Sequence, residues 1–368
     1  MHVRIKKVEI QDKLSKIQNI VEKKSIMPVL NHFLMDITAN SGYILATDLE
    51  TAVKQPLKVE IIEPGKACIP AKKFYEIVRE LDEDIEISLQ EKWLKIQSGR
   101  SNFRLAVMDS SEFPVWPQIG DASRINFSRD LVLTAIDKTI YASGEADARY
   151  FLNGLLFHLK SPDEFHVVGT DGHRLAHFQA KIEGVNLTDE KKVILSKKAL
   201  TELRKFLSDV EAVSIFIGKT HVMFELDGIN FLTRMIEGNY PDYESVIPRT
   251  NEKVAIVDKN LLIASLKRVS VLSRERQNAV RTEWTEDLLV LSSSDPELGE
   301  ARDELAVEYQ SEAIAVGFNA KYLIDSLEKI SSDKAKIYMK EPERAVYITE
   351  NQEKDNFIYE SVVMPLRL

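Results

Sequence analysis

The segment Thr170-Asp171-Gly172-His173-Arg174 carries the side chains most able to do chemistry. A carboxylate, an imidazole and a guanidinium so close together could provide a base with its orienting acid, or two metal ligands. Three further histidines, at 158, 166 and 177, could converge across a sheet, but no HxxxH, HExxH, GxSxG, P-loop or GxGxxG pattern is present. A tight turn capped by the aspartate explains the segment more simply. A hydrolase that uses Asp171 and His173 is therefore the minor alternative.

Segments of this type recur along the chain. A Thr-Asp or Ser-Asp pair closes an apolar run three times, at separations of 123 and 124 residues: Thr47-Asp48, Thr170-Asp171 and Ser294-Asp295. A second landmark follows each pair, at separations of 127 and 124 residues: Phe113-Pro114, Tyr240-Pro241 and Met364-Pro365. Repetition at this length indicates one domain present three times. We predict domains at 1–121, 122–250 and 251–368.

Two helices with many strands are expected in each repeat. One amphipathic segment with lysines lies between the landmarks of each copy, at 70–81, 195–207 and 316–330. Another precedes the first landmark, at 11–24, 130–143 and 259–273. The remaining chain reads as short β-branched or aromatic strands, and Asp171-Gly172 joins 164–170 to 173–180 as a hairpin. These patterns predict an α+β fold with antiparallel sheets.

Composition excludes several classes of protein. Hydrophobic residues at 44% and charged residues at 29% are typical of a globular protein. The single cysteine, Cys68, excludes a disulfide framework and a cysteine zinc site, and suits a reducing cytoplasm. The first residues lack the apolar core of a signal peptide, and no apolar run approaches the ~18 residues of a membrane span. We expect a cytoplasmic or nucleoid-associated protein without metal, cofactor or membrane.

The formal net charge of −9 is unevenly distributed. Six helical windows (11–24, 71–80, 130–149, 196–207, 259–276 and 319–329) hold 20 Lys+Arg and 12 Asp+Glu, a net of +8, which leaves −17 for the rest. At 100° per residue the cations of 197–205 lie opposite the apolar residues of 200–207. A solvated helix face explains any single stripe of this kind. Recurrence against an acidic remainder favours a surface for a polyanion instead.

The carboxyl end, Ser361–Leu368, stops on apolar residues directly after a predicted strand. Such an end must be buried or must line a groove, because exposed termini are usually polar and frayed. A final core strand and a groove wall are both compatible with the residues. Pro365 counts against a continuing strand, since it has no backbone N–H to donate.

Four motifs closely resemble those of the bacterial DNA polymerase III beta subunits, the replicative sliding clamps: RYFLNG at 149–154, TDGHRLA at 170–176, YPDY at 240–243 and VVMPLRL at 362–368. The resemblance covers the whole chain. It implies a non-enzymatic, head-to-tail homodimer, a six-domain ring with helices inside and sheets outside. Such a ring encircles double-stranded DNA without reading its sequence, tethers the polymerase and confers processivity. A protein-only scaffold without DNA is the other alternative to consider.

The resemblance also implies a cleft between the central and C-terminal domains that binds a short peptide with a glutamine and bulky apolar residues. Its partners are the polymerase alpha subunit, an ATP-driven clamp loader, other polymerases, ligase and mismatch-repair proteins. Ser245 and Ala345 replace an arginine and a serine of some relatives. The cleft residues carried over by position are Leu152, Thr170, Gly172, His173, Arg174, Leu175, Pro241, Val246, Asn319, Tyr322, Val346, Val362, Val363, Met364, Pro365 and Leu366.

Two further surfaces complete the prediction. Lys24 matches a basic position of the family's inner surface, whereas Ala146 replaces a polar residue that contacts DNA in some relatives. Helical phase adds further DNA-facing candidates: Lys72, Lys73, Arg79, Arg149, Lys197, Lys198, Arg204 and Lys205. At the dimer interface the resemblance implies Phe103 and Leu105 on one subunit, with Val271 and Leu272 on the other beside the acidic run 297–304. Phe103 could equally be an ordinary core residue.

Overall fold

The structure is a computed structural model, and it describes residues 1–21, 27–120, 122–185, 187–208, 210–273, 278–351 and 356–367. The chain forms two compact units, one of residues 1–132 with 198–235 and one of residues 133–197 with 236–368. The boundaries fall within α3 (Arg129–Thr139) and at the start of α4 (Lys197–Leu207). The central predicted domain thus contributes to both units, because its strands pair with those of both neighbours. The two predicted domain boundaries stay a prediction.

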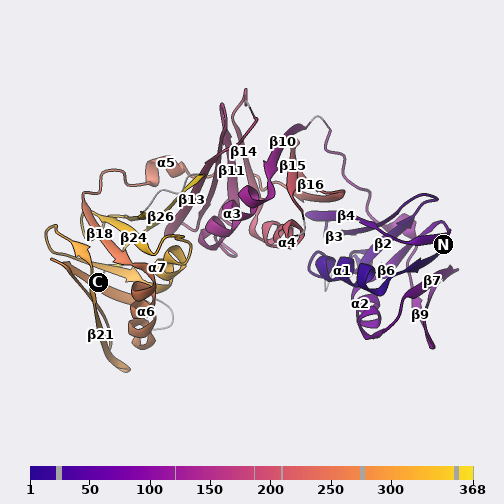
Figure 1. Cartoon of the computed structure of the whole chain (residues 1–368), viewed down its shortest axis with the longest axis horizontal. Helices are drawn as coiled ribbons and strands as arrows, with labels where there is room; N and C mark the ends of the chain where they lie inside the picture. The colour runs from indigo at the N-terminus through magenta and orange to yellow at the C-terminus, as the bar shows by residue number, and fades with distance from the viewer. Residues whose placement is uncertain are drawn as a thin grey trace. The chain divides into compact units, whose positions relative to one another are not determined.

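The first unit contains a five-stranded and an eight-stranded antiparallel sheet (Figure 1). The five-stranded sheet has the order β5 (Glu60–Glu63), β1 (His2–Ile5), β7 (Ile85–Gln90), β8 (Trp93–Ser98) and β9 (Ser101–Ala106). The eight-stranded sheet has the order β10 (Ser123–Ser128), β15 (Ala212–Ile217), β16 (His221–Leu226), β17 (Ile229–Arg234), β4 (Thr51–Leu57), β3 (Gly42–Thr47), β2 (His32–Ile37) and β6 (Gly65–Pro70). Antiparallel pairing of β17 with β4 joins the first and central repeats in one sheet.

Helices cover the eight-stranded sheet of the first unit. Helix α1 (Lys7–Ile17) packs on α2 (Ala71–Glu80), and both contact this sheet. Phe74 of α2 lies against Phe33 of β2, and Phe206 of α4 lies against Phe231 of β17. Each of these rings is almost fully buried, which stabilises the packing by roughly 1.5–3 kcal/mol per side chain. Two short 3₁₀ turns, η1 (Pro28–Asn31) and η2 (Ser110–Glu112), complete the unit.

The second unit contains a nine-stranded and a four-stranded antiparallel sheet. The nine-stranded sheet has the order β14 (Lys191–Ser196), β11 (Gly154–Lys160), β12 (Glu164–Thr170), β13 (Arg174–Lys181), β26 (Phe357–Val363), β25 (Val346–Glu350), β24 (Lys334–Met339), β18 (Lys253–Asp258) and β22 (Glu308–Tyr309). The four-stranded sheet has the order β21 (Gly299–Ala306), β20 (Leu288–Asp295), β19 (Ala279–Thr285) and β23 (Ile314–Asn319). Seven register pairs between β13 and β26 join the central and C-terminal repeats.

Helices and turns of the second unit surround its core. Helix α6 (Lys259–Val269) packs on α7 (Ala320–Leu327), and Trp284, Tyr309 and Phe318 lie in the core between sheets and helices. The short α5 (Tyr243–Val246) covers part of the nine-stranded sheet, where Tyr243 joins an apolar cluster with Leu175 and Val362. The turns are η3 (Ile140–Ala142), η4 (Tyr150–Leu152) and η5 (Ser270–Leu272).

Most predicted elements are confirmed. The 164–170 and 173–180 hairpin is β12 and β13, and the windows at 70–81 and 195–207 are α2 and α4. Helix α1 differs from the predicted 11–24, since it begins at Lys7 and ends at Ile17. The 316–330 window was too long, because its first residues complete β23 and Asn319 caps α7 by accepting a hydrogen bond from the Lys321 amide. Among the described residues, no helix is long and apolar enough to cross a membrane.

Candidate partner-binding and nucleic-acid surfaces

The Thr170-Asp171 pair builds a turn between β12 and β13. Thr170 Oγ1 donates to the Arg174 carbonyl at 2.6 Å and accepts from the Gly172 amide at 3.1 Å. Asp171 Oδ1 accepts from the amides of His173 and Arg174 at 2.9 and 3.0 Å. Gly172 has a φ of +87°, the left-handed region that glycine adopts without strain. The polar side chains therefore satisfy the backbone of the turn.

The same turn recurs at the first repeat. Thr47 Oγ1 donates to the Thr51 carbonyl at 2.9 Å, and Asp48 Oδ1 accepts from the amides of Glu50 and Thr51. Leu49 takes the place of Gly172 with a φ of +76°. At the third repeat Asp295 Oδ1 accepts from the Glu297 and Leu298 amides. The repeated Asp is thus a structural capping residue.

This geometry gives the hydrolase alternative no support. Oδ1 of Asp171 is occupied by two backbone amides, and Oδ2 accepts from Arg174 Nε at 3.0 Å. The imidazole of His173 instead lies over Tyr322, with 6.5 Å between ring centroids. Asp171 therefore does not orient the imidazole as a general base requires. Among the described residues, no cluster of three His, Cys, Asp or Glu side chains could hold a metal ion.

Arg174 is the best-anchored polar residue of the predicted cleft, and its side chain is 9% exposed. Its guanidinium binds Asp171 Oδ2, Asp325 Oδ2 at 2.6 Å and the Tyr141 carbonyl at 2.8 Å. It also lies 4.5 Å from the centre of the Tyr322 ring. Burial lowers the pKa of Arg174, but the bonds and charges of the two aspartates outweigh it and leave the pKa raised. A fixed cation therefore lies beneath His173 and Tyr322.

Arg149 lies beside the same turn, although helical phase suggested that it faces DNA. Its Nη2 donates to the Asp171 carbonyl at 3.2 Å and to Asp147 Oδ2 at 2.9 Å. A Cβ on Gly172 would stand 3.1 Å from the guanidinium, so the absence of a side chain at this position leaves room for Arg149. The structure thus groups Arg149 with the cleft residues; a role toward DNA stays a prediction.

The C-terminal residues meet this region from β26. Leu175 pairs in register with Val362, and Arg174 with Val363, which also pairs with Val346. Beyond the strand, the Met364 amide donates to the His173 carbonyl at 2.9 Å and the Leu366 amide to the Gly317 carbonyl at 2.8 Å. Pro365 lies between these two donors. The end is therefore a core strand as far as Val363, and its role as the wall of a groove stays a prediction.

The sixteen predicted cleft residues divide by exposure. Those in the core are Leu152, Thr170, Leu175, Val346, Val362 and Val363. Those partly exposed are Arg174, Asn319, Tyr322, Pro365 and Leu366, and those exposed are Gly172, His173, Pro241, Val246 and Met364. The apolar residues Val246 and Met364 are 43% and 41% exposed. We call the exposed and partly exposed residues the partner surface. Sequence reasoning missed Asp325 and Tyr141, which hold Arg174 and gave no signal beyond helical position.

The cationic candidates differ in how firmly the protein already holds them. Lys198 Nζ contacts Asp48 Oδ2 at 2.5 Å, and Lys205 Nζ contacts Glu202 Oε2 at 2.5 Å. Lys197 reaches the Ser143 carbonyl, and Arg204 is exposed on α4. On α2, Lys72, Lys73 and Arg79 are all exposed, and they pair with the partly exposed Glu76 and the exposed Glu80, pairs that cost little to exchange. Lys24 lies outside the described residues.

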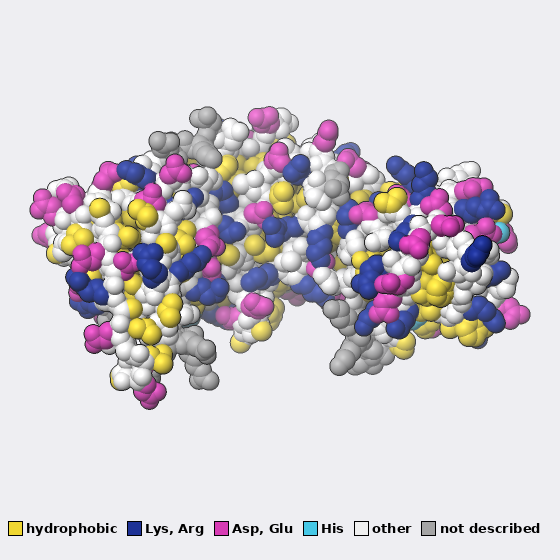
Figure 2. Space-filling model, turned by 60° about the horizontal axis from the view of Figure 1, so that its bottom comes forward, with side chains coloured by type: hydrophobic (Ala, Val, Ile, Leu, Met, Phe, Trp, Pro, Cys, Tyr) yellow, Lys and Arg dark blue, Asp and Glu magenta, His cyan; other side chains and the backbone are white. Residues whose placement is uncertain are grey.

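Both charge signs occur on the surface in view in Figure 2, where lysine and arginine side chains lie among acidic ones. The pairs on α2 and α4 show the same mixture at residue level. The predicted separation into a cationic and an anionic surface therefore stays a prediction.

Within the described part of the chain, one sheet of each unit ends in a strand that pairs on one side only. In the first unit β9 pairs only with β8, and its Phe103 and Leu105 side chains are at least partly exposed. Arg104 of this strand lies 4.7 Å from the Trp93 ring. In the second unit β21 pairs only with β20, and η5 beside it carries Val271, 74% exposed, and Leu272. Exposed edges of this kind can pair with another chain.

Comparison with known proteins assigns the family. The chain matches the N-terminal, central and C-terminal domain models of the DNA polymerase III beta subunit over residues 1–117, 126–242 and 244–367. It is similar to the beta sliding clamps of Pseudomonas putida, 30% identical over 374 residues, and Haemophilus influenzae, 31% identical over 373 residues, with 100% of each chain covered.

The fold agrees with this assignment. The sliding clamp of Pseudomonas aeruginosa solved in complex with griselimycin matches over 100% of both chains, with a TM-score of 0.95 and 29% identity. Three repeated domains of antiparallel strands with few helices are thus a clamp fold. The chain belongs to the DNA polymerase III beta subunit family, the beta sliding clamps, which are non-catalytic processivity factors of DNA replication.

Proposed function

We propose that this chain forms a head-to-tail homodimer, a ring of six domains with boundaries near 121 and 250 that encircles double-stranded DNA. The ring tethers the replicative polymerase through its alpha subunit, and clamp loader, other polymerases, ligase and mismatch-repair proteins bind the same surface in turn. It acts in the cytoplasm, at the nucleoid. The observation that carries the proposal is the match of all three repeats to clamp domains.

The sheet edges support ring closure. Within the units, strands of successive repeats join into sheets of eight and nine strands. The five-stranded and four-stranded sheets remain with β9 and β21 as edges. Pairing β9 of one subunit with β21 of the next would join the five-stranded and four-stranded sheets into one sheet of nine strands, the third sheet shared by two domains. Such a head-to-tail contact is heterologous, and it closes into a ring when the rotation suits.

Side chains at the two edges are complementary. The β9 side offers Phe103 and Leu105 with Arg100 and Arg104, and the β21 side offers Val271 and Leu272 with Glu300 and Glu304. Apolar burial would supply the affinity, while opposite charges would fix the register and suppress wrong pairings.

DNA binding in this proposal depends on cations that reach phosphates. Such contacts carry no sequence information, so the ring slides along the duplex. Lys72, Lys73 and Arg79 are the cations best suited to it, because they are exposed and only weakly held. Residence on DNA then follows from the closed ring rather than from affinity.

Partner binding is assigned to the partner surface. Val246 and Met364 provide apolar contacts, and His173 with Tyr322 provides an aromatic wall fixed by Arg174. An apolar anchor within a polar border is typical of a peptide site.

Retention on DNA tests the proposal. Clamps loaded on nicked circular DNA by a clamp loader should remain bound during gel filtration and should leave when the circle is cut. Equal retention on circular and linear DNA would contradict a closed ring. A triple variant Lys72→Glu, Lys73→Glu, Arg79→Glu should load onto the circle less efficiently, whereas a protein-only scaffold would keep its partner binding and show no DNA retention in any form.

A further inference from the structure

Three histidines lie buried on one face of the nine-stranded sheet. His158, His166 and His177 come from β11, β12 and β13 and expose 1%, 4% and 3% of their surface. The rings of His166 and His177 lie edge to edge in nearly parallel planes, with 5.2 Å between centroids and 3° between planes. The convergence that the sequence left open is therefore real, but the nitrogens face each other and neighbouring carboxylates rather than a common centre.

These two rings belong to a continuous chain of hydrogen bonds. His166 Nε2 lies 3.1 Å from Glu164 Oε2, and His166 Nδ1 lies 2.9 Å from His177 Nε2. His177 Nδ1 then lies 3.1 Å from Glu360 Oε2. Each of the four ring nitrogens thus has one partner within the chain.

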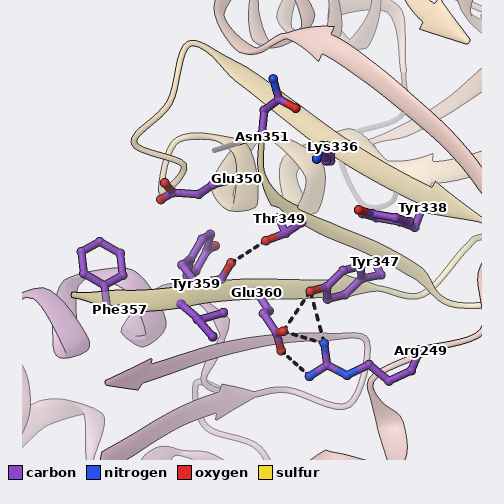
Figure 3. Close-up of a pocket in the computed structure, with 11 residues that line it drawn as sticks. Arg249, Lys336, Tyr338, Tyr347, Thr349, Glu350, Asn351, Phe357, Tyr359 and Glu360 are labelled. Carbon is purple, nitrogen blue, oxygen red and sulfur yellow. Dashed lines mark hydrogen bonds and ion pairs between the residues drawn. The ribbon is translucent and has the colours of Figure 1, made fainter. Parts of the chain in front are cut away.

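Glu360 is held as an anion at the end of this chain. Arg249 donates to both of its oxygens, at 2.6 and 2.9 Å, and the Tyr347 hydroxyl donates to Oε1 at 2.9 Å (Figure 3). Burial raises the pKa of Glu360, but the bonds from His177 and Arg249 outweigh it and lower the pKa to about 2. Glu360 is therefore only an acceptor at neutral pH.

Counting hydrogens gives the charge of the pair. A carboxylate can only accept, so His177 Nδ1 and His166 Nε2 must each carry a hydrogen. The contact between the two rings needs one hydrogen more, on either nitrogen. The four ring nitrogens then carry three hydrogens, whereas two neutral imidazoles would carry two.

We propose that His166 and His177 share one positive charge, and that this buried imidazole–imidazolium pair ties β12 and β13 to the carboxylate of Glu360 on β26. The pair is a proton-binding site within the joint between the central and C-terminal repeats. Loss of its charge would leave one of the three contacts in the chain of hydrogen bonds without a hydrogen.

The surrounding charges balance this assignment. The pair and Arg249 supply two positive charges, and Glu360 and Glu164 supply two negative ones. Burial and, less strongly, the charge of His177 lower the pKa of His166 to about 4, although Glu164 raises it. The lowered pKa disfavours a second proton on the pair.

The other groups facing the pair are already matched. His158 Nδ1 lies 2.9 Å from the hydroxyl of Tyr243, and its Nε2 lies beside Glu190; a neutral ring that donates to Glu190 and accepts from the hydroxyl satisfies both contacts. Burial lowers the pKa of His158, in agreement with that form. Lys160 of β11 pairs with Glu244 of α5, and Lys192 pairs with Glu190. Among the described residues around the pair, each of these charges thus has a counter-charge.

The charge lies where two repeats meet. His177 and Glu360 are register partners in β13 and β26. The same two strands carry Leu175 and Val362 a short distance along, beneath the partner surface. Buried charge pairs of this kind are costly to break when one partner is removed.

Nitrogen-15 NMR of the imidazoles in the full-length protein at pH 7 tests the proposal. We expect protonated-type shifts for three of the four nitrogens of His166 and His177, with His158 as an internal neutral reference. Two protonated nitrogens, or four, would overturn it.

Variants of the carboxylates sharpen the test. In Glu360→Gln the amide can donate to His177 Nδ1, so the pair should fall from three hydrogens to two; retention of three would also refute the assignment. Should this variant fail to fold by circular dichroism, Glu164→Gln on the more exposed side should give the same fall. Glu190→Gln, which faces His158 and Lys192 rather than the pair, is the matched control and should leave the pair at three.

Discussion

Lys198 Nζ lies 2.5 Å from Oδ2 of Asp48, whose side chain is only 3% exposed. The lysine comes from the central repeat and the aspartate from the capped turn of the first repeat. In the corresponding turn of the central repeat, Asp171 accepts a hydrogen bond from Arg174. Arg174 in turn donates to Asp325 of α7, in the C-terminal repeat. Asp48 therefore acts twice, once for its own turn and once for the neighbouring repeat, and Asp171 is linked to the neighbouring repeat through Arg174.

Removing the cation from this pair should destabilise the first unit. We expect Lys198→Met to lower the free energy of unfolding by about 1–2 kcal/mol, less than for a fully buried pair, because the lysine side chain is largely exposed. Urea denaturation followed by circular dichroism measures the change. Lys73→Met, on the exposed face of α2, is the control and should cost under about 0.5 kcal/mol. Equal effects of the two variants would contradict a special role for the Asp48 pair.

The turn glycine offers a second test. Gly172→Ala should destabilise the protein by about 1–2 kcal/mol, since alanine at a φ of +87° is strained and its Cβ would press on Arg149. Differential scanning calorimetry measures the loss. Leu49→Gly in the equivalent turn is the counterpart: relief of strain and loss of backbone entropy oppose each other, so the melting temperature should change little. A larger loss for Leu49→Gly would show that conformation does not limit these turns.

Asp325 should control partner affinity without belonging to the partner surface. Asp325→Asn removes one of the two carboxylates on Arg174, which frees the guanidinium beneath Tyr322. We expect the dissociation constant for a fluorescent peptide with a glutamine and two leucines to rise about 5–20-fold, the equivalent of about 1–2 kcal/mol. Glu328→Gln on the exposed side of the same segment should leave it unchanged. An unaltered affinity in Asp325→Asn would exclude a positioning role.

Salt dependence can count the phosphate contacts of α2. Each contact contributes about 0.9 to the slope of log K against log salt concentration. Removing Lys72, Lys73 and Arg79 together by substitution with glutamine should therefore lower the slope by about 3 if all three reach DNA. Fluorescence anisotropy of a short duplex at several salt concentrations gives the slope. Glutamine in place of Lys95, Lys219 and Lys340 is the control set, and an equal change there would show only a general charge effect.

Acid should weaken the joint between β13 and β26. The pKa of Glu360 is about 2 in the folded protein and about 4.3 in an unfolded chain. A lowered folded pKa gives stability that is complete above the unfolded value and is lost as the pH falls through the folded one. We expect Glu360 to contribute about 3 kcal/mol above pH 5 and progressively less down to pH 2. Urea midpoints between pH 7 and 3 should fall less steeply in Glu360→Gln than in the parent; parallel curves would contradict the prediction.

Local patterns predicted the elements well because they have strong local causes. Alternating apolar and cationic residues located α2 and α4, and Asp171-Gly172 located the hairpin. The start of α1 was missed because Lys6 provides no side-chain cap and an apolar spacing does not continue before Ile10. The two joined sheets could not be predicted, since the pairing of β17 with β4 depends on contacts between distant segments.

Site residues divide in the same way. The motif resemblance placed Arg174, Tyr322 and Val362 in one region, and the structure brings them together. Arg149 was assigned by helical phase, yet it lies outside any helix, directly before η4 and beside Gly172, where that phase has no meaning. Glu360 and Arg249 escaped notice because a carboxylate on a strand and an arginine in a connection carry no pattern until the strands pair.

The position of β26 between β13 and β25 has a consequence for synthesis of the protein. Strand β13 leaves the ribosome long before β26 is made. Its outer edge therefore has no hydrogen-bonding partner while an entire further repeat is translated. During that interval the nascent chain exposes a strand edge with unpaired backbone groups. Protection of that edge, by a chaperone or by rapid completion of the chain, is then a condition for obtaining native clamps.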